Sequence, residues 1–481
     1  MRPHRLAVTP ARRLPVAPRP WLAALACGLL GLTASAHANT LQVTSLADSG
    51  AGSLRQAIAD AAPGDRIAFA AGLTGTIYLD STLTMNKSLH VVGGPGIALD
   101  GRDAVRVLSV GSGVTLTLDS LAVQHGQASD GGGILSDGNL VLNACSVRNN
   151  HAGNRGGGIF ISAGNYTITA SDISGNSAGG EGGGLLDLGT AASSIDSSII
   201  SGNMAASQGG GIRHASGKAL TVGYSLVTGN TLASAGTTLG GGISNQDSPM
   251  TVHDSIISGN KARYAGGIYV VRVSSPSSLQ LDRSLVTGNT AESDGGGIFV
   301  FGANMTALNS TVANNLADAG TSGGIGIQNT SGSTASVQLQ LSTVAFNRSA
   351  GAGGGISVIS GTLNLKNSLL AGNTATANPD LSGSFTSLGY NLVQTRGGSI
   401  GHVASDLPNA TDPRLLPLAF NGGTSATAAL QAGSPAINAI PSAICGGVTV
   451  DQRGYRRPAG NCDIGAYDSE AVAVLFADGF E

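Results

Sequence analysis

The chain has 481 residues, of which 74 are Gly; 41% are hydrophobic and only 11% are charged. The charged share is less than half of the usual roughly 25%, and Gly is about twice as common as usual. A disordered chain would be poorer in hydrophobic residues and richer in charge, so the composition excludes one. Acidic residues outnumber basic ones and no basic run follows residue 38, so we expect no nucleic-acid partner.

Residues 1–38 have the three parts of a secretory signal peptide. Arginines come first, an apolar run follows from Trp21 to Leu32, and Ala36-His37-Ala38 fits a cleavage site. This run is too short to cross a bilayer, which takes about 20 residues, and no longer run follows. We therefore expect cleavage near Ala38, export to the cell surface or the medium, and no transmembrane helix. A twin-arginine signal at Arg12 and lipidation of Cys27 are weaker alternatives.

Residues 39–120 are expected to form an N-terminal cap and the first coils of a repeat. Ser53 and Gln56 have capping-box spacing. Leu54, Ala57, Ile58 and Ala61 would then share one face of a short helix that ends before Pro63. Short alternating runs separated by Gly and Pro predict strands at 41–44, 67–69, 77–79, 89–92, 105–107 and 114–118.

Residues 121–373 repeat one pattern, in which Ser-x-Val/Ile-x-x-Asn is followed by Gly-Gly-Gly-Ile. The glycine unit ends at Ile134, Ile159, Leu185, Ile212, Ile243, Ile268, Ile298, Ile325 and Ile356. Recurrence every 20 to 50 residues is typical of a solenoid. Within one period, 159–161, 166–169 and 172–173 predict three short strands with turns between them. We expect an all-β parallel β-helix of ten or more coils, right-handed as parallel crossovers almost always are.

An Asn recurs once per coil, at a predicted turn. An amide both donates and accepts, so stacked Asn side chains can bond one another along the solenoid. The glycines are expected to form the turn into the next strand. Both motifs are therefore assigned a structural role; the Asn positions are Asn150, Asn176, Asn203, Asn230, Asn260, Asn289, Asn315, Asn347 and Asn373.

These repeats are similar to those of polymorphic outer-membrane proteins and, more widely, resemble parallel β-helix proteins of the pectate-lyase-like class. The stretch Gly52 to Ile58 resembles the opening of bacterial secreted members. Residues 374–470 resemble the C-terminal module called choice-of-anchor Q; the matching segments are 379–381, 389–392, 412–415, 433–437, 451–454 and 463–467. The resemblance implies a fold but no definite activity.

Residues 374–470 are expected to form a loop-rich C-terminal cap, and residues 471–481 a tail that is either a sorting signal or a frayed end. Cys445 and Cys462 are the plausible disulfide pair of an exported chain. Cys145 takes the place of the Ser found in other repeats and is expected to be a small buried residue. The charged residues between Asp451 and Asp463 predict either a salt-bridged clasp or a site.

One local group of side chains interrupts an apolar column on consecutive coils: Asp187, His214 and Asn245. Arg213 and Glu181 lie beside them in the sequence. A hydrogen-bonded polar patch is the first interpretation, and a catalytic site is the alternative. The sequence has no repeated column of carboxylates that would predict a metal site. A calcium ion is therefore expected only if the protein is a lyase.

The residue after each Ile should point outward, and it is aromatic at Phe160, Tyr269 and Phe299. Such rings could stack on sugars or lie under loops. The sequence thus favours an exported, adhesin-like rod that binds polysaccharide or another surface partner, with no cofactor. The alternative is a polysaccharide lyase or glycoside hydrolase. The oligomeric state stays open.

Overall fold

The computed structural model describes residues 38–233, 236–445 and 447–473. From Ala38 onward the chain forms one compact unit. Residues 1–37 of the predicted signal peptide, and 474–481 of the predicted tail, lie outside the described residues. Neither described helix is long and apolar enough to cross a membrane.

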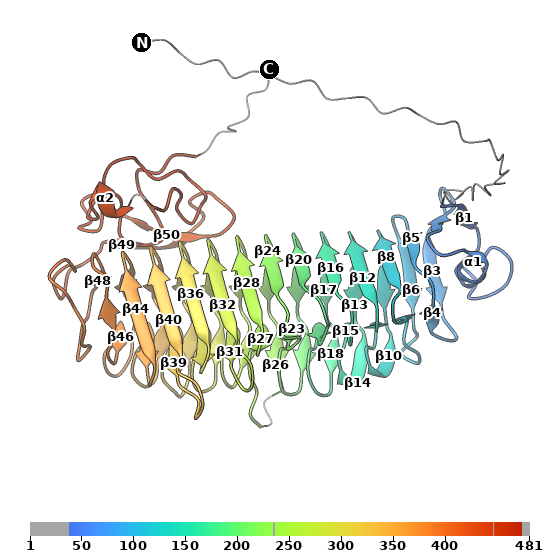
Figure 1. The fold of residues 1–481 in the computed structure, drawn as a ribbon, viewed down its shortest axis with the longest axis horizontal. Coiled ribbons are helices and arrows are strands. Elements are labelled where there is room, and N and C mark those ends of the chain that lie inside the picture. Colours follow the sequence, from blue (N-terminus) through green and yellow to red (C-terminus); the bar gives the residue numbers. More distant parts are fainter. Residues whose placement is uncertain (1–37, 234–235, 446, 474–481) are drawn as a thin grey trace, which may run out of the picture. The chain divides into compact units, whose positions relative to one another are not determined.

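The unit is a parallel β-solenoid built from four long sheets, which we name A to D (Figure 1). One coil shows the plan: β15 (Ile159–Ile161) belongs to sheet C, β16 (Tyr166–Thr169) to A, β17 (Asp172–Ser174) to B and β18 (Ser177–Ala178) to D. The strands predicted at 159–161 and 166–169 are confirmed, and the one at 172–173 extends to Ser174. Sheet D has strands of mostly two residues, too short for an alternating pattern to reveal.

Sheets A and B contribute the longest ladders. Sheet A has fourteen strands: β1 (Thr40–Val43), β2 (Arg66–Phe69), β5 (Leu89–Val92), β8 (Thr115–Asp119), β12 (Asn139–Asn143), β16, β20 (Ser193–Asp196), β24 (Leu220–Gly223), β28 (Pro249–His253), β32 (Ser278–Asp282), β36 (Asn304–Leu308), β40 (Ser336–Gln340), β44 (Thr362–Lys366) and β47 (Thr386–Ser387). Sheet B has thirteen: β3 (Gly75–Tyr78), β6 (Ile97–Asp100), β9 (Ala122–Gln124), β13 (Ser146–Arg148), β17, β21 (Ile199–Ser201), β25 (Leu226–Thr228), β29 (Ile256–Ser258), β33 (Leu285–Thr287), β37 (Thr311–Ala313), β41 (Thr343–Ala345), β45 (Leu369–Ala371) and β48 (Leu392–Val393).

Sheets C and D complete each coil. Sheet C has twelve strands: β4 (Leu83–Met85), β7 (Leu108–Val110), β11 (Ile134–Ser136), β15, β19 (Leu185–Asp187), β23 (Ile212–His214), β27 (Ile243–Gln246), β31 (Ile268–Val271), β35 (Ile298–Phe301), β39 (Ile325–Gln328), β43 (Ile356–Val358) and β46 (Leu381–Ser382). Sheet D has nine: β10 (Gln127–Asp130), β14 (His151–Arg155), β18, β22 (Met204–Ala205), β26 (Thr231–Leu232), β30 (Lys261–Ala262), β34 (Thr290–Ala291), β38 (Leu316–Ala317) and β42 (Arg348–Ser349).

The first coil is covered by α1 (Leu54–Asp60), as the sequence predicts. Ser53 caps the helix, because its Oγ accepts a hydrogen bond from the backbone N–H of Gln56 at 3.2 Å. Leu54, Ala57 and Ile58 are buried. One nearby prediction is wrong: residues 105–107 form no strand, because the chain turns from Gly101 to Val105 and pairing starts at Leu108.

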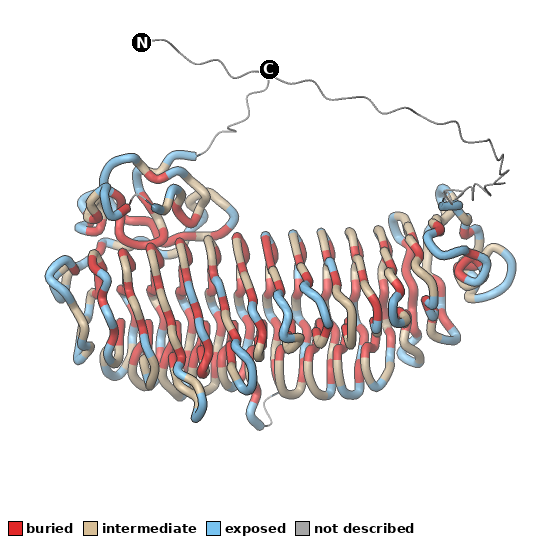
Figure 2. The backbone as a smooth tube through the Cα atoms, viewed as in Figure 1, coloured by how far each residue is buried: buried red, intermediate tan, exposed pale blue. Residues whose placement is uncertain are grey.

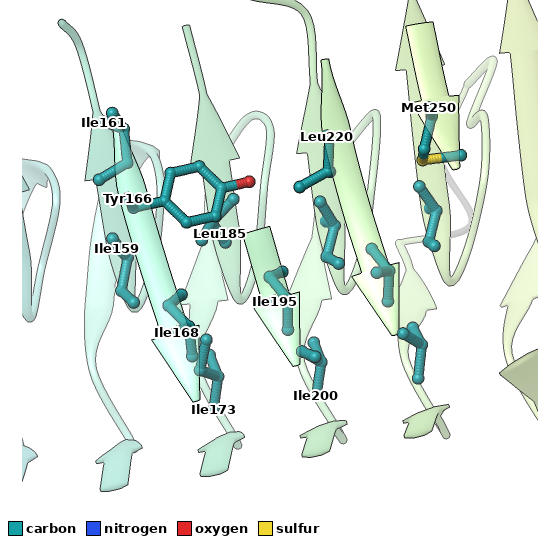
Figure 3. Close-up of a cluster of buried hydrophobic side chains, with 14 of the residues drawn as sticks. Ile159, Ile161, Tyr166, Ile168, Ile173, Leu185, Ile195, Ile200, Leu220 and Met250 are labelled. Carbon is teal, nitrogen blue, oxygen red and sulfur yellow. The ribbon is translucent and has the colours of Figure 1, made fainter. Parts of the chain in front are cut away.

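Alternate strand residues fill the interior of the coils (Figure 2). In β16, Tyr166 and Ile168 are buried, whereas Thr167 between them is exposed. Figure 3 shows Ile159, Ile168, Ile173 and their counterparts in the next coils stacked in one continuous core. Each fully buried side chain of this kind contributes about 1.5–3 kcal/mol.

Two ladders of side chains line the turns. In the Asn ladder, each amide Nδ2 donates to the Oδ1 of the next Asn at 2.9–3.0 Å, and the backbone N–H donates to the same oxygen; the bonds run from Asn150 through Asn373. In the second ladder, backbone N–H groups donate to the Ser Oγ of the following coil. Cys145 begins this second ladder, and burial raises the pKa of its thiol.

The solenoid continues beyond the last repeat visible in the sequence. The Nδ2 of Asn373 donates to Asp380 Oδ1 at 2.9 Å, so Asp380 takes the place of the next Asn in the ladder. Strands β46, β47 and β48 complete another coil. Burial raises the pKa of Asp380, although its hydrogen bonds oppose the shift.

Residues 413–473 then fold back along the coils instead of closing the end, and we call them the C-terminal module. The module contains the antiparallel pair β49 (Leu415–Ala419) and β50 (Thr427–Leu430), and α2 (Ser442–Cys445). A disulfide joins Cys445 to Cys462. Gln452 contacts Thr311 at 2.5 Å, and the backbone N–H of Ala466 donates to Thr343 Oγ1 at 3.0 Å. The module therefore covers sheet B over several coils.

Candidate functional site

The polar group predicted from the sequence is divided by sheet C into two parts. Asp187, His214 and Asn245 point into the coil and are 0% exposed. Arg213 and Glu181 lie on the outer face, since Arg213 alternates with Ile212 and His214 along β23. The structure brings Asp187 to His214, and Arg213 to Glu181, but it keeps the two pairs apart.

The inner pair is a closed hydrogen-bonded unit. His214 Nδ1 lies 2.7 Å from Asp187 Oδ2, and His214 Nε2 lies 3.0 Å from the carbonyl oxygen of Lys218. Both ring nitrogens thus face oxygen atoms of the chain, which fix the orientation of the imidazole. The Tyr166 hydroxyl and the Gly189 N–H complete the bonding of the carboxylate. Burial, with the Asp187 charge, raises the pKa of Tyr166 far above its usual value.

Asn245 extends this inner group by one coil. Its Nδ2 donates to the carbonyl oxygens of Ser248 at 3.0 Å and Ser278 at 3.1 Å. These contacts hold the connection between β27 and β28. None of the three inner side chains can contact a polymer outside the coil, so the geometry supports the hydrogen-bonded patch.

In the outer pair, Arg213 is covered and Glu181 is half-buried. Arg213 is 4% exposed, and its Nη2 donates to Gln246 Oε1 at 2.6 Å while Nε lies 3.4 Å from Glu181. Burial lowers the pKa of Arg213, and the Glu181 charge opposes the shift. The described residues contain no group of three or more His, Cys, Asp or Glu side chains that could hold a metal ion.

Of the two interpretations of the outward aromatic rings, the covered one fits the structure. Phe160, Tyr269 and Phe299 are only 4–5% exposed. Tyr269 and Phe299 stack with ring centroids 6.2 Å apart, in a small apolar cluster of their own with Ala265 and Val271. The Arg155 guanidinium lies 4.9 Å from the centroid of the Phe160 ring. The rings lie outside the coil interior, but neighbouring segments of the same chain cover them, so they offer little surface to a ligand.

The charged residues of the C-terminal module form a clasp. Asp451 and Arg453 pair at 2.6 Å, and Arg457 pairs with Asp468 at 3.1 Å. Arg457 also donates to Asn309 Oδ1 at 3.1 Å, which links the module to the solenoid. Burial lowers the pKa of Arg457, and the neighbouring carboxylates oppose the shift. Of the two interpretations of this cluster, the clasp fits its contacts.

The outer face of sheet A carries a regular feature that sequence reasoning missed. Parallel pairing aligns one outward residue from each of ten consecutive strands, and we call this set the sheet A column. Nine of its members have a hydroxyl or amide side chain and none is charged: Thr117, Val141, Thr167, Ser194, Thr221, Thr251, Gln280, Thr306, Gln338 and Asn364. All are half-buried or exposed. The strands that bear them lie side by side in Figure 1.

Comparisons with known proteins identify no family for this chain. No protein-family profile matches the chain, and no curated protein matches it. Among solved structures, the crystal structure of pectate lyase Pel9A is similar, with a TM-score of 0.41 and 13% sequence identity, over 89% of this chain and 97% of that chain. By its sheet topology, the protein is a parallel β-solenoid of about fourteen turns.

Proposed function

We propose that this protein is exported and acts at the cell surface or outside the cell as an adhesin-like rod that binds polysaccharide. The observation that carries the proposal is the sheet A column. Hydroxyl and amide groups both donate and accept hydrogen bonds, which suits the hydroxyls of a glycan chain. Parallel strands repeat about every 4.8 Å, so the ten positions span roughly 43 Å, and nine of them carry an uncharged side chain that can hydrogen-bond.

The remainder of the chain supports this role. The Cys445–Cys462 disulfide suits an oxidising, extracellular compartment. The predicted signal peptide would supply export. Residues 374–470, whose sequence resembles choice-of-anchor Q, would supply attachment to the surface. The inner Asp187–His214 pair stabilises the coil in this proposal and has no catalytic task.

The test uses the mature protein on a glycan array and in binding titrations with the polymers that bind. Replacing Thr221 and Thr251 together by Val keeps the side-chain shape and removes two hydroxyls from the column. At about 0.5–1.5 kcal/mol per hydrogen bond, binding should weaken about tenfold. Thr287→Val, on the outer face of sheet B, is the matched control and should leave affinity unchanged.

Two results would contradict the proposal. One is equal affinity of the double variant and the control. The other is release of sugar fragments from a polymer by the wild-type protein, lost in His214→Ala with the fold intact, which would favour the lyase or hydrolase alternative.

A further inference from the structure

A notch lies between two protruding connections from sheet C to sheet A. Residues 272–277 join β31 to β32, and residues 329–335 join β39 to β40. The coil between them turns with only Gly302-Ala303, so the two longer loops stand on either side of a gap. Its cavity measures about 400 Å³, with Val271 to Ser274 on one wall, Thr330 to Ser333 on the other, and Phe301 between them.

Both walls of the notch are held in place by their own hydrogen bonds. The Asp247 carboxylate accepts from the backbone N–H groups of Val273 at 2.7 Å, Ser274 at 3.1 Å and Ser275 at 3.2 Å. In the other wall, the Thr330 N–H donates to the Ser333 carbonyl at 3.0 Å. A ligand would therefore meet a preformed surface and would lose little affinity to loop ordering.

The second wall also leans onto the floor of the notch. Gly302 has a φ of 62°, and a Cβ placed there would lie 2.6 Å from the Thr330 side chain. The Thr330 side chain therefore packs directly against the backbone at position 302, next to Phe301.

Arg272 places a cationic group in this notch. Its Nη1 donates to Ser333 Oγ on the opposite wall at 3.2 Å. No carboxylate of the described residues lies within ion-pair distance of its guanidinium. The Asp247 carboxylate, from the preceding coil, accepts from the backbone and the Ser274 hydroxyl of the loop 272–277 and does not line the cavity. The remaining N–H groups of the Arg272 guanidinium can therefore bind an anionic oxygen from outside the chain.

We propose that the notch binds an anionic residue of a glycan, either a uronate carboxylate or a sulfate ester. The guanidinium would pair with the anionic group, Phe301 would contact the apolar face of the sugar ring, and the hydroxyls of Ser274 and Ser333 would bond ring hydroxyls. The inference rests on the proposed glycan binding and adds to it a preference for acidic sugars at one place on the solenoid.

The experiment measures the binding of mature protein to dextran, dextran sulfate and alginate by titration calorimetry. Dextran and dextran sulfate share a backbone and differ in charge, and alginate supplies carboxylates, so the set separates the two sources of anion. Arg272→Ala should weaken binding to the preferred anionic polymer about tenfold or more, as the loss of a charge-assisted hydrogen bond implies. Arg272→Lys should lie in between, because it keeps the charge and loses the planar guanidinium.

Arg263→Ala is the matched control, since Arg263 is exposed on another loop and lies over Tyr264. Unchanged unfolding midpoints would show that all variants fold. Equal binding of dextran and the anionic polymers, or no effect of Arg272→Ala, would contradict the proposed anion site in the notch. Either result would leave the proposal of general glycan binding intact. Wild-type protein that binds none of the polymers, nor any glycan on the array, would overturn both proposals.

Discussion

Removing one member of the Asn ladder should destabilise the solenoid strongly. In Asn230, Nδ2 donates to Ile200 O at 3.0 Å and to Asn260 Oδ1 at 2.9 Å. Its Oδ1 accepts from the backbone N–H and from the Nδ2 of Asn203, both at 3.0 Å. After Asn230→Ala, the buried Asn203 N–H loses its acceptor. A buried group left without a hydrogen-bond partner costs about 1–3 kcal/mol, and a lost hydrogen bond costs about 1 kcal/mol. We therefore expect the free energy of unfolding to fall by about 2–4 kcal/mol.

Chemical denaturation of the mature protein measures this loss, and amide hydrogen exchange locates it. Each coil contacts only its neighbours, so protection should fall around β21, β25 and β29 and remain at β45. Asn154→Ala is the control, because Asn154 is exposed and makes only one long bond, to Asp130 at 3.3 Å. The reasoning would be refuted if the two variants lost equal stability, or if Asn230→Ala lost less than about 0.5 kcal/mol, as a typical surface substitution does.

Three other substitutions test the packing. His214→Leu leaves the buried Asp187 carboxylate without its partner and should cost about 3–5 kcal/mol in denaturation; a loss below 1 kcal/mol would show that the pair is dispensable. Gly210→Ala puts a Cβ 2.5–2.6 Å from two backbone oxygens and should prevent soluble expression, whereas Gly94→Ala, which meets nothing within 4 Å, should express normally. Arg457→Ala should release the C-terminal module, seen as faster proteolysis within it while the coils stay protected; unchanged cleavage would show that the clasp is not needed.

The features that the sequence predicts well are those repeated in every coil. Asn176 and its equivalents recur at one turn, and stacking them requires only that the coils lie in register. The capping helix is predicted because Ser53 and the apolar face of Leu54 to Ile58 are local signals. Such local and repeated patterns can be recognised in the sequence without knowing which segment of the chain packs against them.

The features that the sequence does not reveal depend on neighbours far along the chain. Tyr269 and Phe299 do point away from the coil interior, but the chain beside sheet C covers them, and alternation alone says nothing of such covering. The sheet A column was missed for a related reason. Thr221 and Thr251 align only because the connections between their strands have the lengths that keep the register, and those lengths differ from coil to coil.

The inner polar group shows why an interrupted pattern in a solenoid is weak evidence for a catalytic site. A single Asp in an apolar interior column would lack a partner, and its burial would be costly. The partner has to come from a neighbouring coil at the same position, as His214 does for Asp187. A buried structural pair therefore places polar residues on consecutive coils, and a catalytic site would do the same. The decisive difference is access: side chains inside the coil stabilise it, and recognition belongs to the outward columns and to the loops that vary in length.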